Sequence, residues 1–298
     1  PSAGDWALDR FGAIFLQGTE LTTFDHCIFQ RLDGNGIMIS GYNRNTTISH
    51  NDFSYLGGNA IASWGYTNET KTDPGRPGIL LENAPQAGID GTDGEHPAYN
   101  LILSNTAREI GLYEKQSSFY IQAKTAKSTI QGNVFFNGPR AGINFNDGFG
   151  GGDEIYKNLV FSTCRESGDH GPLNTWDRQP FLTTYRTGEP SMLMAYRHIH
   201  HNFFIDNYSP QESVDNDDGS AYFYTYNNFL VYGSRDLKTD YGGHSNYHYN
   251  NIVAYTDMAL NVNGQEDVFP SGYYNNTVII NKDQLGSPVC DGNAQTIM

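Results

Sequence analysis

Five aspartates between residues 147 and 240 are the residues of this sequence best suited to chemistry. They lie in glycine-rich or asparagine-rich strings, such as Gly168-Asp169-His170-Gly171, where glycine lets the backbone approach a ligand closely. Two carboxyl groups of this kind can serve as the acid and the base or nucleophile of glycoside hydrolysis. The five are Asp147, Asp169, Asp215, Asp217 and Asp240, and Asp218 directly follows one of them.

These aspartates lie at similar distances along the sequence from an asparagine that recurs before each of them. The counts are 14, 11, 13, 15 and 12 residues for Asp147, Asp169, Asp215, Asp217 and Asp240. If each asparagine marks one turn of a repeating fold, carboxylates on neighbouring turns lie about 5 Å apart, and those two turns apart about 10 Å. Such separations bracket those of retaining and inverting glycosidases, and mutual repulsion would raise the pKa of one carboxyl, as a general acid requires. Asp-Gly and Asn-Asp pairs also form turns, so a structural role is the alternative for each aspartate.

The recurring asparagine indicates the elements that must position these side chains. An Asn-x-apolar string or a close relative recurs at spacings of 54, 28, 25, 44, 26, 23 and 25 residues. Its asparagines are Asn51, Asn105, Asn133, Asn158, Asn202, Asn228, Asn251 and Asn276. A second match, at an offset of 24, aligns Asn35 and Ile37 with Asn59 and Ile61.

A period near 25 with two or three short apolar runs is typical of one coil of a β-helix, and a β-sandwich gives no reason for it. We therefore predict an all-β fold, a right-handed parallel β-helix of about ten coils. In it the asparagines bond to one another from coil to coil, and the apolar residues after each asparagine alternate between the interior and the outer face.

The predicted β-helix is one domain over residues 1–298, with two insertions at about 66–100 and 173–197. Insertions in solenoids leave at turns and often wall a binding face, and the second insertion is rich in aromatic residues. The first coil, at Gly12–Gly18, already matches the repeat with no capping element before it. The sequence is therefore expected to be a segment of a longer protein.

Basic and aromatic residues of the central coils are the expected substrate contacts. Arg165, Trp176 and Arg178 would shape sugar subsites, because an indole offers a flat face to a sugar ring, and Asp147 and Asp240 would support them. No residue is assigned as a metal ligand. Calcium stays open as a cofactor because Asp215, Asp217 and Asp218 resemble a calcium cluster, although Gly219 comes one place too early for an EF-hand loop.

Composition excludes several classes of partner. The net charge of −15 would repel phosphate, so no nucleic-acid partner is expected, and no apolar stretch approaches the 18 residues of a membrane span. Three cysteines are too few for a disulfide framework. The Asn-x-Ser/Thr sequons at Asn45, Asn68, Asn207 and Asn275 favour a secreted, extracellular glycoprotein.

Residues 147–233 resemble the central coils of right-handed parallel β-helix carbohydrate-active proteins, most closely family 141 of the glycoside hydrolases. The matching strings are Gly168-Asp169-His170-Gly171 and Asp217-Asp218-Gly219-Ser220, the second followed by Asn228-Phe229-Leu230-Val231. The resemblance implies an acid/base and nucleophile pair at Asp169 and at Asp217 or Asp218. The family's usual Ser or Thr is replaced by Gly168, and the sequence of the 173–197 insertion is its own, so the substrate is not carried over.

The leading hypothesis is a secreted protein that hydrolyses a glycosidic bond in a polysaccharide or other glycan. The alternative is an extracellular structural or adhesive solenoid without turnover, which would self-associate or join other domains of a longer chain. A polysaccharide lyase or epimerase is a third hypothesis. It would need a basic residue such as Arg140 or Lys124 to neutralise a uronate.

Overall fold

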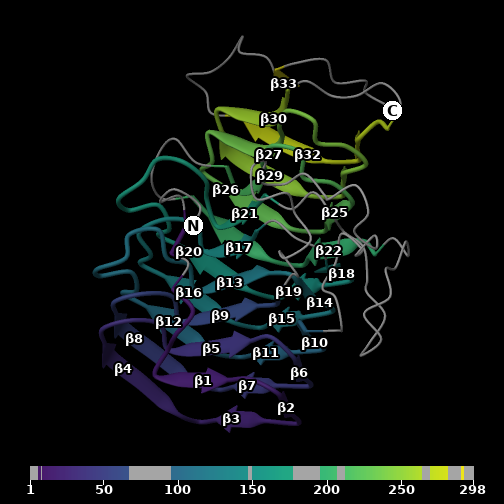
Figure 1. Ribbon diagram of the computed structural model, residues 1–298. Coiled ribbons are helices and arrows are strands. Elements are labelled where there is room, and N and C mark those ends of the chain that lie inside the picture. Colours follow the sequence, from purple (N-terminus) through teal and green to yellow (C-terminus); the bar gives the residue numbers. More distant parts are fainter. Residues whose placement is uncertain are drawn as a thin grey trace, which may run out of the picture.

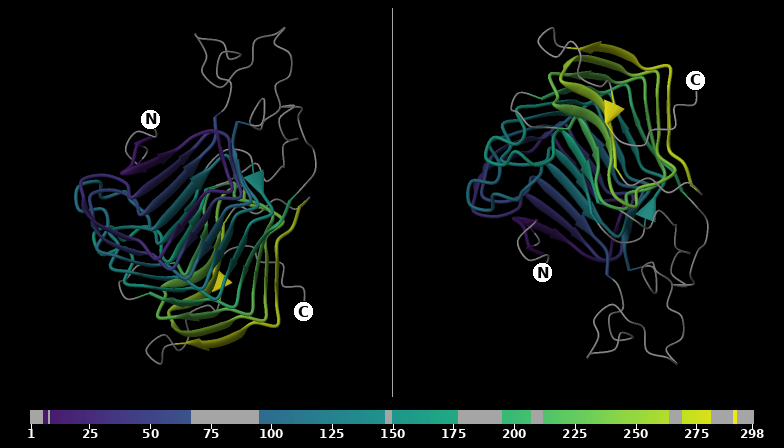
Figure 2. Two further views of the ribbon diagram at one scale, coloured as in Figure 1. Left: turned by 90° about the horizontal axis from the view of Figure 1, so that it is seen from below. Right: turned by 90° about the horizontal axis from the view of Figure 1, so that it is seen from above.

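The computed structural model describes residues 6–7, 9–66, 95–146, 150–176, 195–206, 212–263, 269–280 and 290–291. These residues form 33 β-strands and no helix, and the strands wind in sequence order around one axis (Figure 1). Every pairing between strands is parallel and joins neighbouring coils. The views from below and above show the coils lying over one another (Figure 2). The predicted all-β parallel β-helix is therefore confirmed.

Three long sheets run the length of the solenoid. Sheet A contains β1 (Ile14–Leu16), β5 (Ile37–Ser40), β9 (Ile61–Trp64), β13 (Tyr120–Ala123), β17 (Ile143–Phe145), β21 (Leu173–Thr175), β24 (Val214–Asn216), β27 (Arg235–Thr239), β30 (Met258–Val262) and β33 (Cys290–Asp291). Sheet C contains β3 (Thr23–Asp25), β7 (Thr47–Ser49), β11 (Leu101–Leu103), β15 (Thr129–Gln131), β19 (Glu154–Tyr156), β22 (Arg197–His200), β25 (Phe223–Tyr226), β28 (Tyr247–Tyr249) and β31 (Gly272–Tyr274). Sheet D contains β4 (Ile28–Leu32), β8 (Asp52–Leu56), β12 (Thr106–Arg108), β16 (Val134–Phe136), β20 (Leu159–Phe161), β23 (Phe203–Ile205), β26 (Phe229–Val231), β29 (Ile252–Thr256) and β32 (Thr277–Ile280).

A short fourth sheet lies between sheets A and C in the first five coils. Sheet B contains β2 (Thr19–Glu20), β6 (Asn43–Arg44), β10 (Pro97–Ala98), β14 (Thr125–Ala126) and β18 (Gly150–Gly151). Among the described residues the strands make nine complete coils, and β33 adds one further strand. This count is slightly below the predicted ten. Crossovers between parallel strands of one sheet are right-handed in nearly all proteins, so the predicted hand stands.

The interior is mainly a stack of apolar side chains that continues from coil to coil. The predicted pairing of Ile37 with Ile61 is present, and in sheet D the middle residue of each short strand points inward. Phe135 is thus fully buried, whereas Val134 and Phe136 on either side of it are half-buried. The expected alternation between interior and outer face is therefore confirmed.

A ladder of asparagines forms the corner between sheets C and D. Each of the eight predicted asparagines except the last donates its backbone N–H and one amide N–H to Oδ1 of the asparagine in the next coil, at 2.9 to 3.1 Å. The other amide hydrogen binds a backbone carbonyl, as Asn202 does with Ile155. The ladder thereby satisfies polar backbone that the corner would otherwise bury.

The residue before each ladder asparagine has left-handed backbone, with φ between 52° and 66°. This conformation turns the chain sharply and places the side chain on the outside of the corner. Only Gly adopts it freely, and yet seven of the eight positions hold another residue. They are His50, Ser104, Lys157, His201, Asn227, Asn250 and Asn275, with Gly132 as the eighth.

The stack includes parts of both predicted insertions. Strand β10 lies inside the range 66–100, and β21 lies inside 173–197. Residues 67–94 and 177–194, the centres of the two ranges, lie outside the described residues. The part of the chain that the structure describes has no helix that is long and apolar enough to cross a membrane.

Candidate active site on the outer face of sheet A

The outer face of sheet A changes from apolar to polar along the solenoid. At one register position it carries Met38, Ala62 and Ile121 in the early coils. In the later coils the same position carries polar side chains. The residues on either side of it in each strand point into the interior, so the side chain at this position faces outward. The polar side chains are, in order, Asn144, Asn174, Asp215 and Lys238.

Asp215 lies at the centre of this polar patch, and its side chain is completely buried. Nδ1 of His170 and Nδ2 of Asn174 each lie 2.9 Å from its Oδ2, and Nζ of Lys238 lies 3.0 Å from its Oδ1. Burial alone would raise the pKa of Asp215. The hydrogen bond from His170 and the charge of Lys238 outweigh it and lower this pKa to about 2. Asp215 is therefore a fixed negative charge.

Lys238 joins three carboxylates. Its Nζ lies 3.0 Å from Asp215, 2.9 Å from Oδ2 of Asp240 and 3.6 Å from Oδ1 of Asp217. Burial would lower the pKa of this ammonium, but the surrounding carboxylates raise it well above its usual value. The ammonium is thus permanently charged, and it holds Asp217 and Asp240 together at the end of the strands.

Two further carboxyl groups in this patch bind protons more tightly than usual. Burial and the charge of Asp215 raise the pKa of Asp217, with Lys238 opposing them. Burial and the same charge raise the pKa of Glu212 to about 8. The site therefore combines a strongly ionised carboxylate, Asp215, with Glu212, which holds a proton near neutral pH, and with Asp217, whose pKa is raised. Acid–base catalysis needs such a division between carboxyl groups.

His170 connects this patch to a second group of charges. Nη2 of Arg140 lies 2.6 Å from Nε2 of His170, and a guanidinium can only donate, so Nε2 accepts and Nδ1–H donates to Asp215. The carboxylate of Asp169 lies 3.4 Å from both Arg140 and His170. The ring of Trp6 covers His170, with 5.2 Å between the ring centroids, and the Arg140 guanidinium lies 4.6 Å from the Trp6 ring.

The structure brings together three of the predicted site residues, since carboxylate oxygens of Asp217, Asp218 and Asp240 all lie within 4.8 Å of one another. Asp169 lies beyond His170, and its side chain is 70% exposed. Trp176 packs beside Trp6 and Trp64 at the apolar end of the same face. Arg165 lies apart, in an ion pair with Glu109 at 3.0 Å.

The other predicted residues are four that the structure does not describe and two exposed asparagines. Asp147, Arg178, Asn68 and Asn207 lie outside the described residues. Asn45 and Asn275 are exposed at coil corners with left-handed backbone.

The predicted column of aspartates, near one strand or its following turn, holds for three of its members. Asp215 lies within β24 of sheet A, and Asp217 and Asp240 each directly follow their strands. Asp147 lies outside the described residues. Asp169 instead precedes its strand, β21, at the opposite end of the sheet. The reason is the variable turn between sheets D and A. Leu173 of β21 follows Asn158 by 15 residues, whereas Leu237 of β27 follows Asn228 by only 9. The same number of residues after the ladder asparagine therefore reaches a different place on sheet A in each coil.

Sequence reasoning missed the residues that tune these aspartates, namely His170, Asn174, Glu212 and Lys238. One signal was available, because Lys238 stands 23 residues after Asp215, which is one coil, and pairs with it in register. The burial that raises the pKa of Glu212 has no sequence signal.

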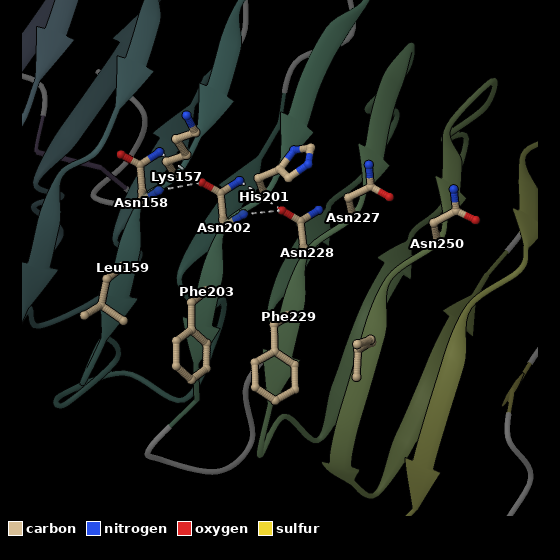
Figure 3. Close-up of a pocket in the computed structure, with 11 residues that line it drawn as sticks. Lys157, Asn158, Leu159, His201, Asn202, Phe203, Asn227, Asn228, Phe229 and Asn250 are labelled. Atoms are coloured by element: carbon tan, nitrogen blue, oxygen red, sulfur yellow. Dashed lines mark hydrogen bonds between the residues drawn. The ribbon is translucent and has the colours of Figure 1, made fainter.

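A groove lies on a different part of the surface, beside the asparagine ladder. It has a volume of about 650 Å³, and Lys157, His201, Asn227 and Asn250 form one side (Figure 3). Leu159, Phe203, Phe229 and Ile252 form the other side. No carboxylate lines it, so among the described residues the groups for acid–base chemistry gather on sheet A and not here.

The cluster of Asp217, Asp218 and Asp240 offers the oxygen donors that calcium prefers. The ammonium of Lys238, 2.9 Å from Asp240, already supplies positive charge there. A calcium ion at this place would have to compete with it.

Comparison with known proteins gives one structural relative and no sequence relative. No protein-family model matches the sequence, and no curated protein matches it. A solved structure described as a glycoside hydrolase superposes with a TM-score of 0.56 at 13% sequence identity, over 89% of this chain and 38% of that one. The two chains share the β-helix fold. This chain thus spans little more than a third of the length of that relative, and the likeness agrees in fold with the resemblance seen in the sequence.

Proposed function

We propose that this chain is the β-helix of a carbohydrate-active protein that hydrolyses a glycosidic bond in a polysaccharide. The observation that carries the proposal is the division of carboxyl groups around Lys238. Asp215 has a pKa of about 2, while the pKa of Asp217, 3.6 Å from the same ammonium, is raised. The structural relative described as a glycoside hydrolase supports the same class of substrate.

In the proposed mechanism Asp217 is the general acid and Asp240 is the base or nucleophile. Lys238 contacts both reactive groups, and Asp215 acts on Asp217 through its charge, so these two are positioning residues. Asp218 lies within reach of the same pair. The half-buried ring of Trp176 would bind a neighbouring sugar ring, while Trp64 is buried beneath it in the apolar cluster. Asp169 remains the second candidate for the base, on the far side of His170.

The two candidate pairs predict different stereochemistry. Oxygens of Asp217 and Asp240 lie within 4.8 Å, which suits the short carboxyl separation of a retaining enzyme. A pair formed by Asp169 and Asp217 would invert the anomeric carbon if its carboxyl groups stood far enough apart to admit a water molecule. Proton NMR of the first product formed decides between the pairs.

The experiment measures the release of reducing ends from a panel of polysaccharides by the wild type and by D217N, D240N, D169N and D218N. We expect D217N and D240N to reduce turnover by at least about a hundredfold, on the scale of general acid–base catalysis. D52N, which changes an aspartate on sheet D, is the control and should keep full activity. Unchanged turnover in D217N would refute the mechanism, and absence of any product from the panel would refute the function.

A structural solenoid without turnover is the second candidate, and one observation favours it. Oδ1 of Asp217 accepts the N–H of Asp218 at 2.9 Å, and Oδ1 of Asp240 accepts from Tyr241 at 3.0 Å, as turn-forming aspartates do. On this reading D217N and D240N would lower the melting temperature without any activity to lose. A lyase would be recognised in the same assay by an unsaturated product that absorbs ultraviolet light.

A further inference from the structure

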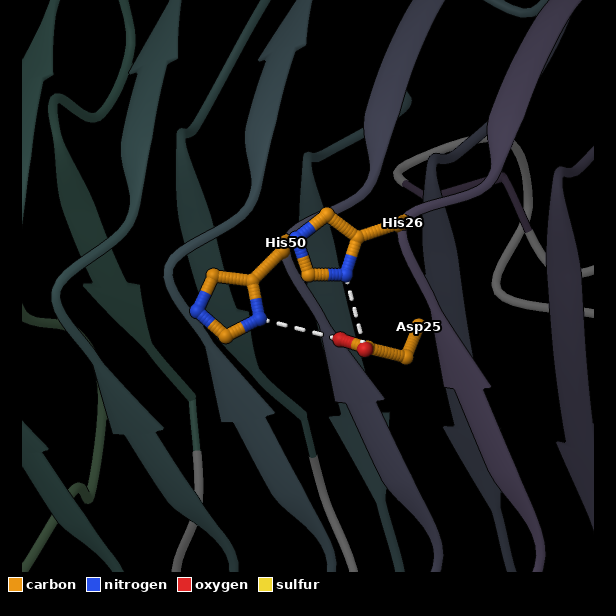
Figure 4. Close-up of side chains that lie close together, drawn as sticks. All are labelled: Asp25, His26 and His50. Carbon is orange, nitrogen blue, oxygen red and sulfur yellow. Dashed lines mark hydrogen bonds and ion pairs between the residues drawn. The ribbon is translucent and has the colours of Figure 1, made fainter.

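Two histidines and one aspartate meet at a corner of the first two coils, far along the solenoid from the acidic cluster on sheet A. Nδ1 of His26 lies 2.7 Å from Oδ2 of Asp25, and Nδ1 of His50 lies 2.9 Å from Oδ1 of the same carboxylate (Figure 4). The two imidazoles stack with 4.8 Å between their centroids. Both nitrogens thus converge on one anionic group from adjacent coils.

The backbone fixes this arrangement. His26 and His50 occupy the left-handed position of their corners, with φ of 54° and 53°, so their side chains leave neighbouring coils in the same direction. Asp25 is held from a third direction by the hydroxyl of Ser49, at 2.6 Å from Oδ1. The hydrogen bonds from Ser49, His50 and His26 lower the pKa of Asp25, which keeps the carboxylate ionised.

The fold does not require histidine here. The same corner position in later coils holds Ser104, Gly132, Lys157, His201 or Asn227, and the ladder continues through all of them. Since left-handed backbone favours Gly or Asn, two successive histidines at this position serve something other than the turn.

The donor set fits a divalent transition metal ion. Two imidazole nitrogens and a carboxylate oxygen are a common protein ligand set for zinc, with a water molecule in the fourth place. All three ligand atoms lie within 4.8 Å of one another, and ligands of a tetrahedral zinc ion stand about 3.3 Å apart, so small rotations of these exposed side chains suffice. Each imidazole can bind through Nδ1 while Nε2 carries the proton.

We propose that Asp25, His26 and His50 form a zinc site that ties the first coil to the second. Zinc would replace the two hydrogen bonds to Asp25 with bonds to the metal, and the proton of each Nδ1 would move to Nε2. Because the ligands come from two coils, binding would stabilise the end of the stack, where the edge of sheet C is covered on one side only. The site needs nothing from the proposed hydrolysis on sheet A.

Isothermal titration of the untagged protein with zinc chloride near neutral pH tests the proposal. We expect one zinc ion per chain, with affinity at least tenfold weaker in H26A, H50A and D25N, and a higher melting temperature with zinc in the wild type only. Calcium should not displace zinc, because calcium prefers oxygen ligands. Absence of zinc binding in the wild type, or equal binding by an H26A/H50A double variant, would overturn the proposal.

Two controls separate this site from other donors. H201A removes a histidine at the same corner position of a later coil. There the two histidine Nδ1 atoms, of His200 and His201, face each other, and the nearby carboxylate of Glu154 contacts only Nε2 of His200. C27S removes the thiol next to His26. Both variants should bind zinc as the wild type does, and loss of binding in either would assign the metal elsewhere. Polysaccharide hydrolysis should be unchanged in H26A, so failure of one proposal leaves the other intact.

Discussion

Arg197 and Asp153 form an ion pair inside the solenoid in which both side chains are completely buried, with 2.8 Å between Nε and Oδ2. The guanidinium carbon lies 5.7 Å from the Phe145 ring and 5.3 Å from the Phe223 ring. Asp153 also accepts hydrogen bonds from Gln122 and from the backbone of Ser128. Burial raises the pKa of Asp153, and the charge of Arg197 opposes that rise.

Replacing one partner of this pair should be far worse than replacing both. R197M leaves a buried carboxylate without its cation, and we expect a loss of about 3–5 kcal/mol in the free energy of unfolding. The double variant R197M/D153L should recover a large part of that loss. K115M breaks the exposed pair with Glu166 and should cost under about 1 kcal/mol. Urea denaturation followed by circular dichroism measures all three, and a small effect of R197M would contradict the expectation.

Removing one rung of the asparagine ladder should also destabilise the stack. N202A eliminates two hydrogen bonds accepted from Asn158 and two donated by the amide, to Ile155 and Asn228. At about 0.5–1.5 kcal/mol for each of the four bonds, the expected loss is about 2–6 kcal/mol. N227G is the matched control, because Asn227 is exposed and glycine accepts its φ of 54° without strain. Comparable melting temperatures for N202A and N227G would show that the ladder adds little.

A buried acid pair predicts that stability falls as the pH rises. The hydroxyl of Ser213 bridges Asp206 and Asp236, at 2.5 Å from Oδ1 of Asp236. Burial raises the pKa of both, that of Asp236 to about 6. The folded protein therefore holds a proton that the unfolded chain releases at about pH 4, so stability is lost as the pH rises from about 4 through 6.

The contribution of Asp236 is isolated by D236N, which imitates the protonated side chain. Between pH 4 and 7 the wild type should lose on the order of 2–3 kcal/mol more than D236N, from the raised pKa of this residue. Urea unfolding at a series of pH values gives the difference directly. Parallel curves for the two proteins would mean that Asp236 is ionised in the fold.

Lys238 should exclude calcium from the acidic cluster. Its ammonium lies within 3.6 Å of three carboxylates, at the place that a cation would take. K238Q should therefore bind calcium at least tenfold more tightly than the wild type in a calorimetric titration. K157Q changes a lysine beside the groove on sheet D and should leave calcium binding unchanged. Tight calcium binding by the wild type would contradict the prediction.

Almost all of the fold could be predicted from the sequence, because the ladder uses one residue type, asparagine, at a nearly constant spacing. All eight asparagines predicted from spacing take part in it, and Ile37 pairs with Ile61 as expected. A coil offers few alternatives, since each strand meets only its equivalents one period away. The predicted number of coils was slightly too high because, among the described residues, no strand of sheets C and D follows β33.

The candidate site was predicted less well because it depends on turns and burial. Asp217 and Asp240 share a place since both follow strands in register, but the long turn before β21 moves Asp169 to the other end of the sheet. The states of Glu212 and Asp215 follow from burial and from charges on three coils. The spacing of the repeat predicts the coil and the sheet in which a residue lies, but it does not predict which side chains bury that residue.

The asparagine ladder also gives the solenoid a polarity. Every ladder amide receives at its oxygen from the coil before and donates from its nitrogen to the coil after, so the amide dipoles point the same way. The two ends of the ladder are therefore chemically unlike. Among the described residues, Asn276 at one end presents free amide donor capacity toward any following coil, which would have to supply an acceptor. Cys27 holds the ladder position at the other end and donates its N–H to Asn51, but its thiol has no amide oxygen to continue the ladder. Coils could therefore be added at the two ends only with different hydrogen-bonding groups, so the ladder has a direction.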